Sequence, residues 1–281
     1  MAVLPPDQPG QTGPLPLHPM NVSDILDASF QLLRANFRAI SIIIAVLVVP
    51  IQLLGALAAR SVYNGNSVVT VINNAANGVP TQTNNSRSAA STISTIATIL
   101  LVPFAAGAIS KLVADSYLGI ATSPGEALRA AGRRYFPLLF AWILVHLMEV
   151  LGLLFFILPG LLVMSLSVAV VPAIVMERLG PVKGIRRSWG LDRRRLWGIL
   201  GIALLTGGVF LVVDGVVGVP FEIAGFLVGL HWGWILLFIG RVLSSVITLP
   251  LGTIVATLVY FDGRIRNEGF DLQILSYRLN H

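Results

Sequence analysis

Four ionisable side chains lie inside long apolar stretches of the sequence: His146, Glu149, Asp214 and Arg241. A charge at mid-depth in a bilayer costs roughly 3 kcal/mol or more, so such a residue is a candidate for function or for pairing. His146 and Glu149 share one helix face because they are three positions apart. Counting 1.5 Å per residue from the span ends places Glu149 and Arg241 at similar depths. The sequence therefore predicts that Glu149 pairs with Arg241.

This intramembrane polar cluster has three interpretations. It is a structural ion pair that holds three helices in register, or a substrate or lipid-headgroup site, or a metal site. In the second case Arg241 binds a phosphate or carboxylate, while Glu149 and His146 relay protons. The metal site is disfavoured because His146 and Glu149 supply only two ligands and no third is evident. Asp214 lies nearer the outer edge and either joins the cluster or faces the interface.

No complete catalytic set is visible in the sequence. There is no Ser-His-Asp set, phosphate-binding loop or dinucleotide fingerprint, and no cysteine for thiolate chemistry. We therefore expect no enzyme activity, no catalytic residue, no bound cofactor and no metal.

A second group of candidate residues forms a basic segment between two apolar stretches. Its members are Lys183, Arg186, Arg187, Arg193, Arg194 and Arg195. One interpretation is membrane topology combined with contact to anionic lipid, worth about 1 kcal/mol per basic residue near the surface. The other is docking of a partner, either another membrane protein or a second copy of the chain. Nucleic acid is not expected, because excess Arg in a membrane protein usually marks the cytoplasmic side.

Composition defines the class of protein that must position these residues. Apolar residues make up 55% of the chain and charged residues only 11%, whereas soluble domains are about one quarter charged. Apolar runs of about 20 residues match the length that crosses a bilayer. The sequence thus predicts an all-α polytopic membrane protein with six spans, at about 39–59, 93–114, 138–155, 161–176, 196–217 and 234–260.

The distribution of basic residues orients these spans. The six-span arrangement places 15 of the 19 Lys and Arg on one side, which is then cytoplasmic. It predicts a multi-pass protein of the bacterial inner (plasma) membrane with both termini in the cytoplasm. Residues 219–233 are either interfacial or part of an extra span. A seventh span would put Arg264, Arg266 and Arg278 outside, against the positive-inside rule.

The predicted organisation has three parts. Residues 1–20 are rich in Pro, Gly and Gln and form a disordered cytoplasmic tail. Residues 21–270 form the membrane domain, interrupted by an extracytoplasmic loop at 61–91 and by a tight outer turn at 158–160. Residues 271–281 form a cytoplasmic C-terminal tail.

The membrane domain also contains an internal repeat. An amphipathic, Arg-bearing segment precedes each odd-numbered span, and the first has its predicted apolar face at Leu26, Phe30, Leu33 and Phe37. Each even-numbered span ends with an acidic residue followed by a glycine, the acids being Asp115, Glu177 and Asp262. The pattern indicates three two-span hairpins, each preceded by a cytoplasmic amphipathic helix.

Several of these segments resemble one known family. The stretches SDILDASFQLLRANF, EALRAAGRRYFPLL, VPAIVMERLGPVKGIRRSWGLDRRRLWGIL and YFDGRIRNEGFDL are similar to the bacterial glycerophosphodiester phosphodiesterase membrane-domain family. The resemblance implies a stand-alone membrane module in which the catalytic barrel of some relatives is absent. The paired His and clustered acids that such an esterase needs for metal-assisted chemistry are also missing, so the activity does not carry over.

The function expected from the sequence is therefore non-enzymatic. The first hypothesis is a scaffold or subunit of a membrane assembly that contacts anionic lipid. The alternative is a transporter or lipid-handling permease that uses the intramembrane polar site. Gly225, Gly229 and Gly233 form a small-residue face, which serves either internal packing or dimerisation.

Overall fold

The computed structural model describes residues 19–63, 76–77, 85–228 and 232–270, and the described chain is helical. Its main elements, in order, are α1 (Val22–Ala35), α2 (Phe37–Tyr63), α4 (Asn85–Tyr117), α5 (Pro124–Gly132), α6 (Tyr135–Phe155), α7 (Ile157–Leu166), α8 (Val170–Met176), α9 (Pro181–Asp192), the short turn η1 (Arg193–Arg195), α10 (Leu196–Val213), the π-helical turn η2 (Asp214–Gly218), α11 (Val219–Val228) and α12 (Gly233–Glu268). The predicted tails, apart from 19–20, and most of the predicted 61–91 loop lie outside the described residues.

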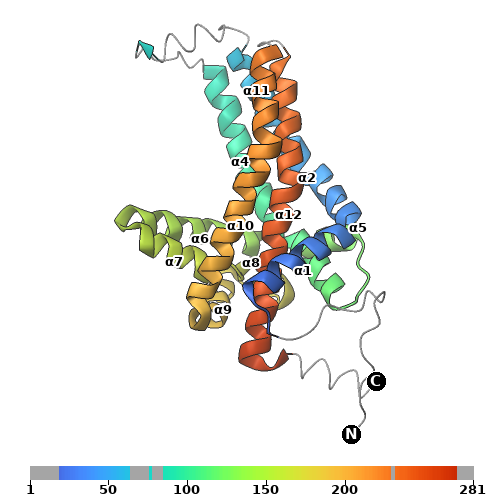
Figure 1. Cartoon of the computed structure of the whole chain (residues 1–281), viewed down its shortest axis with the longest axis vertical. Helices are drawn as coiled ribbons and strands as arrows, with labels where there is room; N and C mark the ends of the chain where they lie inside the picture. The colour runs from blue at the N-terminus through green and yellow to red at the C-terminus, as the bar shows by residue number, and fades with distance from the viewer. Residues whose placement is uncertain (1–18, 64–75, 78–84, 229–231, 271–281) are drawn as a thin grey trace.

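Six helical segments in the described residues are long and apolar enough to cross a membrane, which confirms the predicted fold class. The shorter helices α1, α5 and α9 precede α2, α6 and α10, as the repeat predicted. In Figure 1, α2, α4, α10–α11 and α12 form an elongated column, and the α6–α7 hairpin projects sideways from it.

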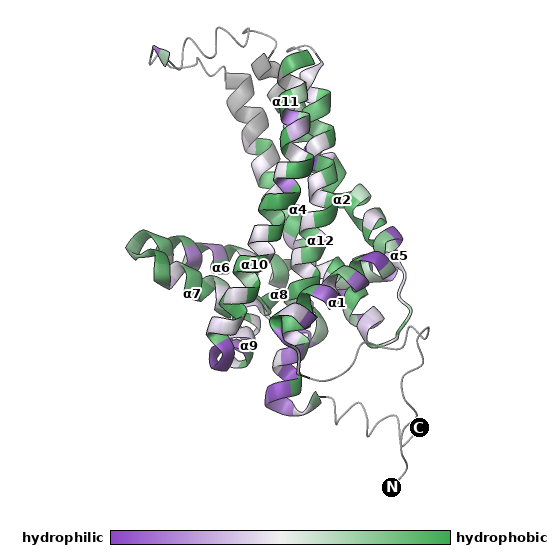
Figure 2. Cartoon of the chain, in the orientation of Figure 1, coloured by the Kyte–Doolittle hydropathy of each residue, from purple (hydrophilic) through white to green (hydrophobic). Residues whose placement is uncertain are grey.

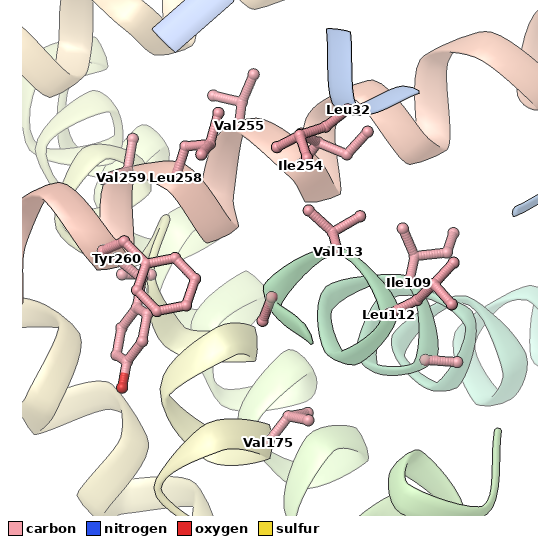
Figure 3. Close-up of a cluster of buried hydrophobic side chains, with 14 of the residues drawn as sticks. Leu32, Ile109, Leu112, Val113, Val175, Ile254, Val255, Leu258, Val259 and Tyr260 are labelled. Carbon is pink, nitrogen blue, oxygen red and sulfur yellow. The ribbon is translucent and has the colours of Figure 1, made fainter. Parts of the chain in front are cut away.

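Much of the core lies where α1, α4, α8 and α12 meet, with buried residues of α2 packed alongside. Figure 3 shows side chains from all four converging, among them Leu32, Ile109, Val175 and Ile254. Burying one such side chain contributes roughly 1.5–3 kcal/mol in water, whereas helices inside a bilayer associate through packing and polar contacts. The core thus joins segments from all three predicted hairpins.

The buried face of α1 agrees with the predicted one in part. Leu33 of the predicted face is buried together with Ile25, Ala28 and Leu32, and Leu26 is half-buried against the core. Phe30 is 36% exposed, and Phe37, which begins α2, is 48% exposed. The structure thus packs the aliphatic residues of α1 inward and leaves both aromatic rings on the accessible side.

The turn between α6 and α7 lies earlier than predicted. Phe156 has extended backbone angles and α7 begins at Ile157, so Pro159 and Gly160 belong to the first turn of α7. Gly152 and Gly160 face each other across the hairpin, and a Cβ at Gly152 would lie 2.9 Å from the Gly160 Cα. Proline is tolerated in a first helical turn, which explains why Pro159 does not mark the bend.

The fourth and fifth spans are not continuous, regular α-helices. The fourth is broken at 167–169, between α7 and α8. The fifth continues through η2 into α11, so residues 219–228 extend an existing helix and do not form a separate interfacial one. Gly225 and Gly233 pack α11 onto α12: a Cβ at Gly233 would lie 2.1 Å from the Gly225 carbonyl oxygen. The small-residue face serves internal packing at these two positions, whereas Gly229 lies outside the described residues.

Candidate functional site at the basic end

Hydrophilic residues gather at one end of the molecule, on α9 and on the C-terminal part of α12 (Figure 2). With 36 residues, α12 is about 54 Å long at 1.5 Å per residue, far more than a hydrocarbon core of about 30 Å requires. Its charged end therefore extends beyond the core. We call this region the basic end.

The first group of contacts at the basic end is organised by Arg187 of α9. Its Nε donates to both carboxylate oxygens of Glu177, at 2.8 and 2.9 Å. Its Nη2 donates to Glu268 Oε2 at 2.9 Å, and Nη1 pairs with the other Glu268 oxygen. The hydroxyl of Tyr260 donates to Glu177 at 2.9 Å. One guanidinium thus ties α9 to the end of α8 and to α12, in the paired-donor geometry that suits arginine and carboxylates.

The second group is organised by Asp262, whose side chain is only 4% exposed. Arg195 pairs with this carboxylate, the Arg266 Nε donates to it at 3.0 Å, and the Met20 amide donates at 2.8 Å. The Met20 carbonyl accepts from Arg195 at 3.0 Å and from Arg266 at 2.9 Å. These contacts join the start of α1 to η1 and to α12. We refer to the two groups together as the basic-end network.

The break in the fourth span is stabilised by side chains of α9. The Ser188 hydroxyl lies 2.6 Å from the Leu166 carbonyl and 3.1 Å from Asp192 Oδ2, and its single proton can serve one of them at a time. Trp189 Nε1 donates to Ser167 Oγ at 3.3 Å. Asp192 is 1% exposed, and its Oδ1 has no hydrogen-bond partner in the described part of the chain. The helix break and α9 are therefore held together by polar contacts.

The third acid of the repeat lies at the end of α4. Asp115 accepts from Lys111 Nζ at 2.7 Å and from the Thr122 hydroxyl at 2.5 Å. The following helix begins with Ser123, whose side chain accepts from the Glu126 amide at 3.3 Å. Hydrogen bonds from the Ser123 backbone and side chain lower the pKa of Glu126. Each repeated acid thus accepts from a cation and helps to hold a span end to its neighbour.

In the described residues, no ion pair links the four predicted intramembrane residues, although His146 and Glu149 lie one turn apart on α6. His146 stacks on Trp142, with ring centroids 3.8 Å apart, and Asp214 accepts from Ser244 at 3.0 Å. Among the described residues, no ion pair joins Glu149 to Arg241. The sideways α6–α7 hairpin carries Glu149, which explains why equal depth along the sequence did not bring the two charges together.

The predicted basic segment divides into two sets. Arg187 and Arg195 belong to the basic-end network. The remaining four are exposed and form no ion pair within the described chain: Lys183, Arg186, Arg193 and Arg194. Sequence reasoning missed the partners Glu268, Arg266 and Met20. The repeated acids Glu177 and Asp262 were the signal that could have located this site.

Fold and charge distribution define a polytopic α-helical membrane protein with one highly charged end. Residues 146–261, from within α6 to near the end of α12, match the family described as "Domain of unknown function (DUF7847)". The search of curated proteins finds no match, and neither does the search of solved structures. The similarity therefore covers the second and third hairpins in part and assigns no activity.

Proposed function

We propose that this chain is a non-enzymatic scaffold or subunit of an assembly in the bacterial plasma membrane, with its basic end in the cytoplasm and in contact with anionic lipid. The observation that carries the proposal is the division of charge at the basic end. Arg187 and Arg195 join separate helices, whereas Arg186, Arg193 and Arg194 form no ion pair in the described chain. The first set makes a rigid platform, and the second presents positive charge beside the membrane, where anionic headgroups attract it.

The resemblance to the glycerophosphodiester phosphodiesterase membrane-domain family supports a membrane module, although the family matched at residues 146–261 carries no such name. Two features of the structure support a structural role over transport. Glu149 and Arg241 form no ion pair in the described residues, and the ion pairs between separate helices lie at a helix end. We extend this to a non-enzymatic module because the carboxylates of the basic-end network are already paired with arginines.

The orientation can be tested by labelling, since the chain has no cysteine. Gly190→Cys places a thiol at an open position of α9, where an added Cβ meets nothing within 4 Å. Trp232→Cys places one at the opposite end, where Trp232 is 60% exposed. In intact cells a membrane-impermeant maleimide should label only the Trp232→Cys variant, and the Gly190→Cys variant should react after permeabilisation. Labelling of the Gly190→Cys variant in intact cells would overturn the proposed orientation.

The assembly role is tested by purification of the full chain in mild detergent. We expect defined protein partners to co-purify, together with enriched anionic phospholipid. A lone monomer that carries no partner would contradict the scaffold role. Arg186→Gln with Arg193→Gln removes two basic charges and is expected to weaken recovery of partner or lipid without unfolding the protein, because neither side chain forms an ion pair in the described residues.

The transporter or lipid-handling permease remains a second candidate because two spans are irregular. The fourth breaks at 167–169, and the fifth contains the π-helical turn η2 beside Asp214. Such irregularities often occur at functional sites, and broken helices form the binding sites of many transporters. Lipid transfer or solute uptake by the purified protein in vesicles, abolished by Asp214→Asn, would favour this candidate over the scaffold.

A further inference from the structure

A cavity of about 300 Å³ lies at the basic end, where η1 and the start of α10 meet the end of α12. Arg194, Arg195 and Arg266 line it, together with Asn267. Two acids, Asp192 and Asp262, also line it, so the arginines outnumber the acids by one. The cavity is therefore electropositive even with both acids ionised.

The three arginines differ in what they already bind. Arg195 and Arg266 hold Asp262 and the Met20 carbonyl, yet the Arg195 Nε and the Arg266 Nη1 have no acceptor in the described residues. Arg194 is exposed and has no ion-pair or hydrogen-bond partner there. One unpaired guanidinium, Arg194, and two arginines with unused N–H donors thus line a single space. This donor set suits the oxygens of a phosphate group.

The other wall of the cavity is apolar. Ile199 and Ile202 of α10 and Val259 of α12 line it, and all three are buried side chains within candidate membrane spans. The cavity therefore has a charged side at η1 and the end of α12, and an apolar side formed by buried residues of α10 and α12. A free phosphate ion would use only the first side, whereas a phospholipid would use both.

We propose that this cavity binds an anionic phospholipid, with the lipid phosphate on Arg194 and the free N–H groups of Arg195 and Arg266. The glycerol and first acyl carbons then lie against Ile199, Ile202 and Val259. This inference deepens the lipid contact of the proposed function and rests on it. It distinguishes one specific site from the general attraction between basic residues and the membrane surface.

The chain offers a matched control for this site. Arg193 precedes Arg194 in the same short turn, is also exposed and has no ion pair in the described chain, but does not line the cavity. Arg193→Gln and Arg194→Gln therefore remove the same charge from neighbouring positions, and neither breaks a contact of the basic-end network.

Native mass spectrometry of the full chain, with added phosphatidylglycerol, measures lipid binding by each variant. Arg194→Gln should weaken binding about tenfold, the effect of losing one charge-assisted contact, whereas Arg193→Gln should change it less than about twofold. Arg194→Lys should retain part of the affinity. Equal losses in the two Gln variants would show general electrostatic attraction and overturn the proposal.

A second series separates a lipid from a free anion. Phosphatidylcholine should bind more weakly than phosphatidylglycerol, and millimolar inorganic phosphate should not displace the bound lipid. Full displacement by phosphate would assign the cavity to a soluble anion and overturn the lipid assignment. Recovery of protein partners from cells is a separate measurement. If the lipid-binding series contradicts the cavity site but partners still co-purify, the lipid proposal fails and the assembly role is retained.

Discussion

The basic-end network and the mid-span polar residues contain similar groups in very different surroundings. At the basic end, Asp262 accepts hydrogen bonds from two arginines and a backbone amide. In the spans, Asp214 accepts one from Ser244, and Glu149 has no ion pair in the described chain. The difference shows that depth in the membrane did not determine which charges are paired. Partners are found where helix ends from different hairpins converge.

The largest effect is expected from Asp262→Ala. It removes the shared acceptor of Arg195, Arg266 and the Met20 amide, and leaves two guanidinium groups close together. Breaking a buried pair by removing one partner costs about 3 kcal/mol or more. Thermal unfolding in detergent should show a clear loss of stability. Asp214→Ala is the comparison, with about 1 kcal/mol expected for its one hydrogen bond; equal losses would remove the distinction between the two regions.

A smaller effect is expected from the coupling between Arg187 and Glu268. Both side chains are 28% exposed, so solvent weakens their attraction. A double-mutant cycle with Arg187→Met and Glu268→Gln should give a coupling free energy of about 1 kcal/mol. The control cycle pairs Arg193→Gln with Glu268→Gln and should be additive. A coupling free energy near zero for Arg187 and Glu268 would mean that this ion pair does not contribute to the stability of the fold.

For the mid-span residues Glu149 and Arg241 we expect no coupling, in contrast to Arg187 and Glu268. Glu149→Gln and Arg241→Met should be additive within about 0.5 kcal/mol, since the structure does not pair the two side chains. Folded yield after purification and unfolding in detergent both report this. If the double variant restores the stability that a single variant loses, the pairing predicted from the sequence is correct and the observed separation of α6 from α12 is not maintained in the membrane.

Sequence periodicity was sufficient for the spans and for the three amphipathic helices, because apolar length and helical spacing are local properties. It was insufficient where two segments had to be placed relative to each other. The Glu149–Arg241 pairing assumed parallel spans, and the sideways α6–α7 hairpin violates that assumption. The repeated acids Glu177 and Asp262 were visible, but their partners lie up to 242 residues away, as in the Met20–Asp262 contact. Contacts between residues so far apart in the sequence produce no local sequence pattern from which they could be predicted.

The smallest effect is expected at Glu126, which lies outside the basic-end network and is fully exposed. Hydrogen bonds from Ser123 lower its pKa. The carboxylate therefore stabilises the start of α5 fully at pH values above the pKa that Glu126 has in the unfolded chain. This contribution is lost as the pH falls through the lowered pKa of the folded state, and Glu126→Gln should remove that pH dependence.

Hydrogen exchange of the α5 amides, expressed as protection factors at neutral pH and near pH 4, compares Glu126→Gln with the parent chain. Protection should fall toward acid pH in the parent and stay flat in the variant, while amides of α9 behave alike in both. A parallel loss of protection in α9 would mean that the capping carboxylate is coupled to the basic-end network. That result would show that the exposed Glu126 cap and the basic-end network are not independent, because protonation of Glu126 would then change the stability of the ion pairs that join the hairpins.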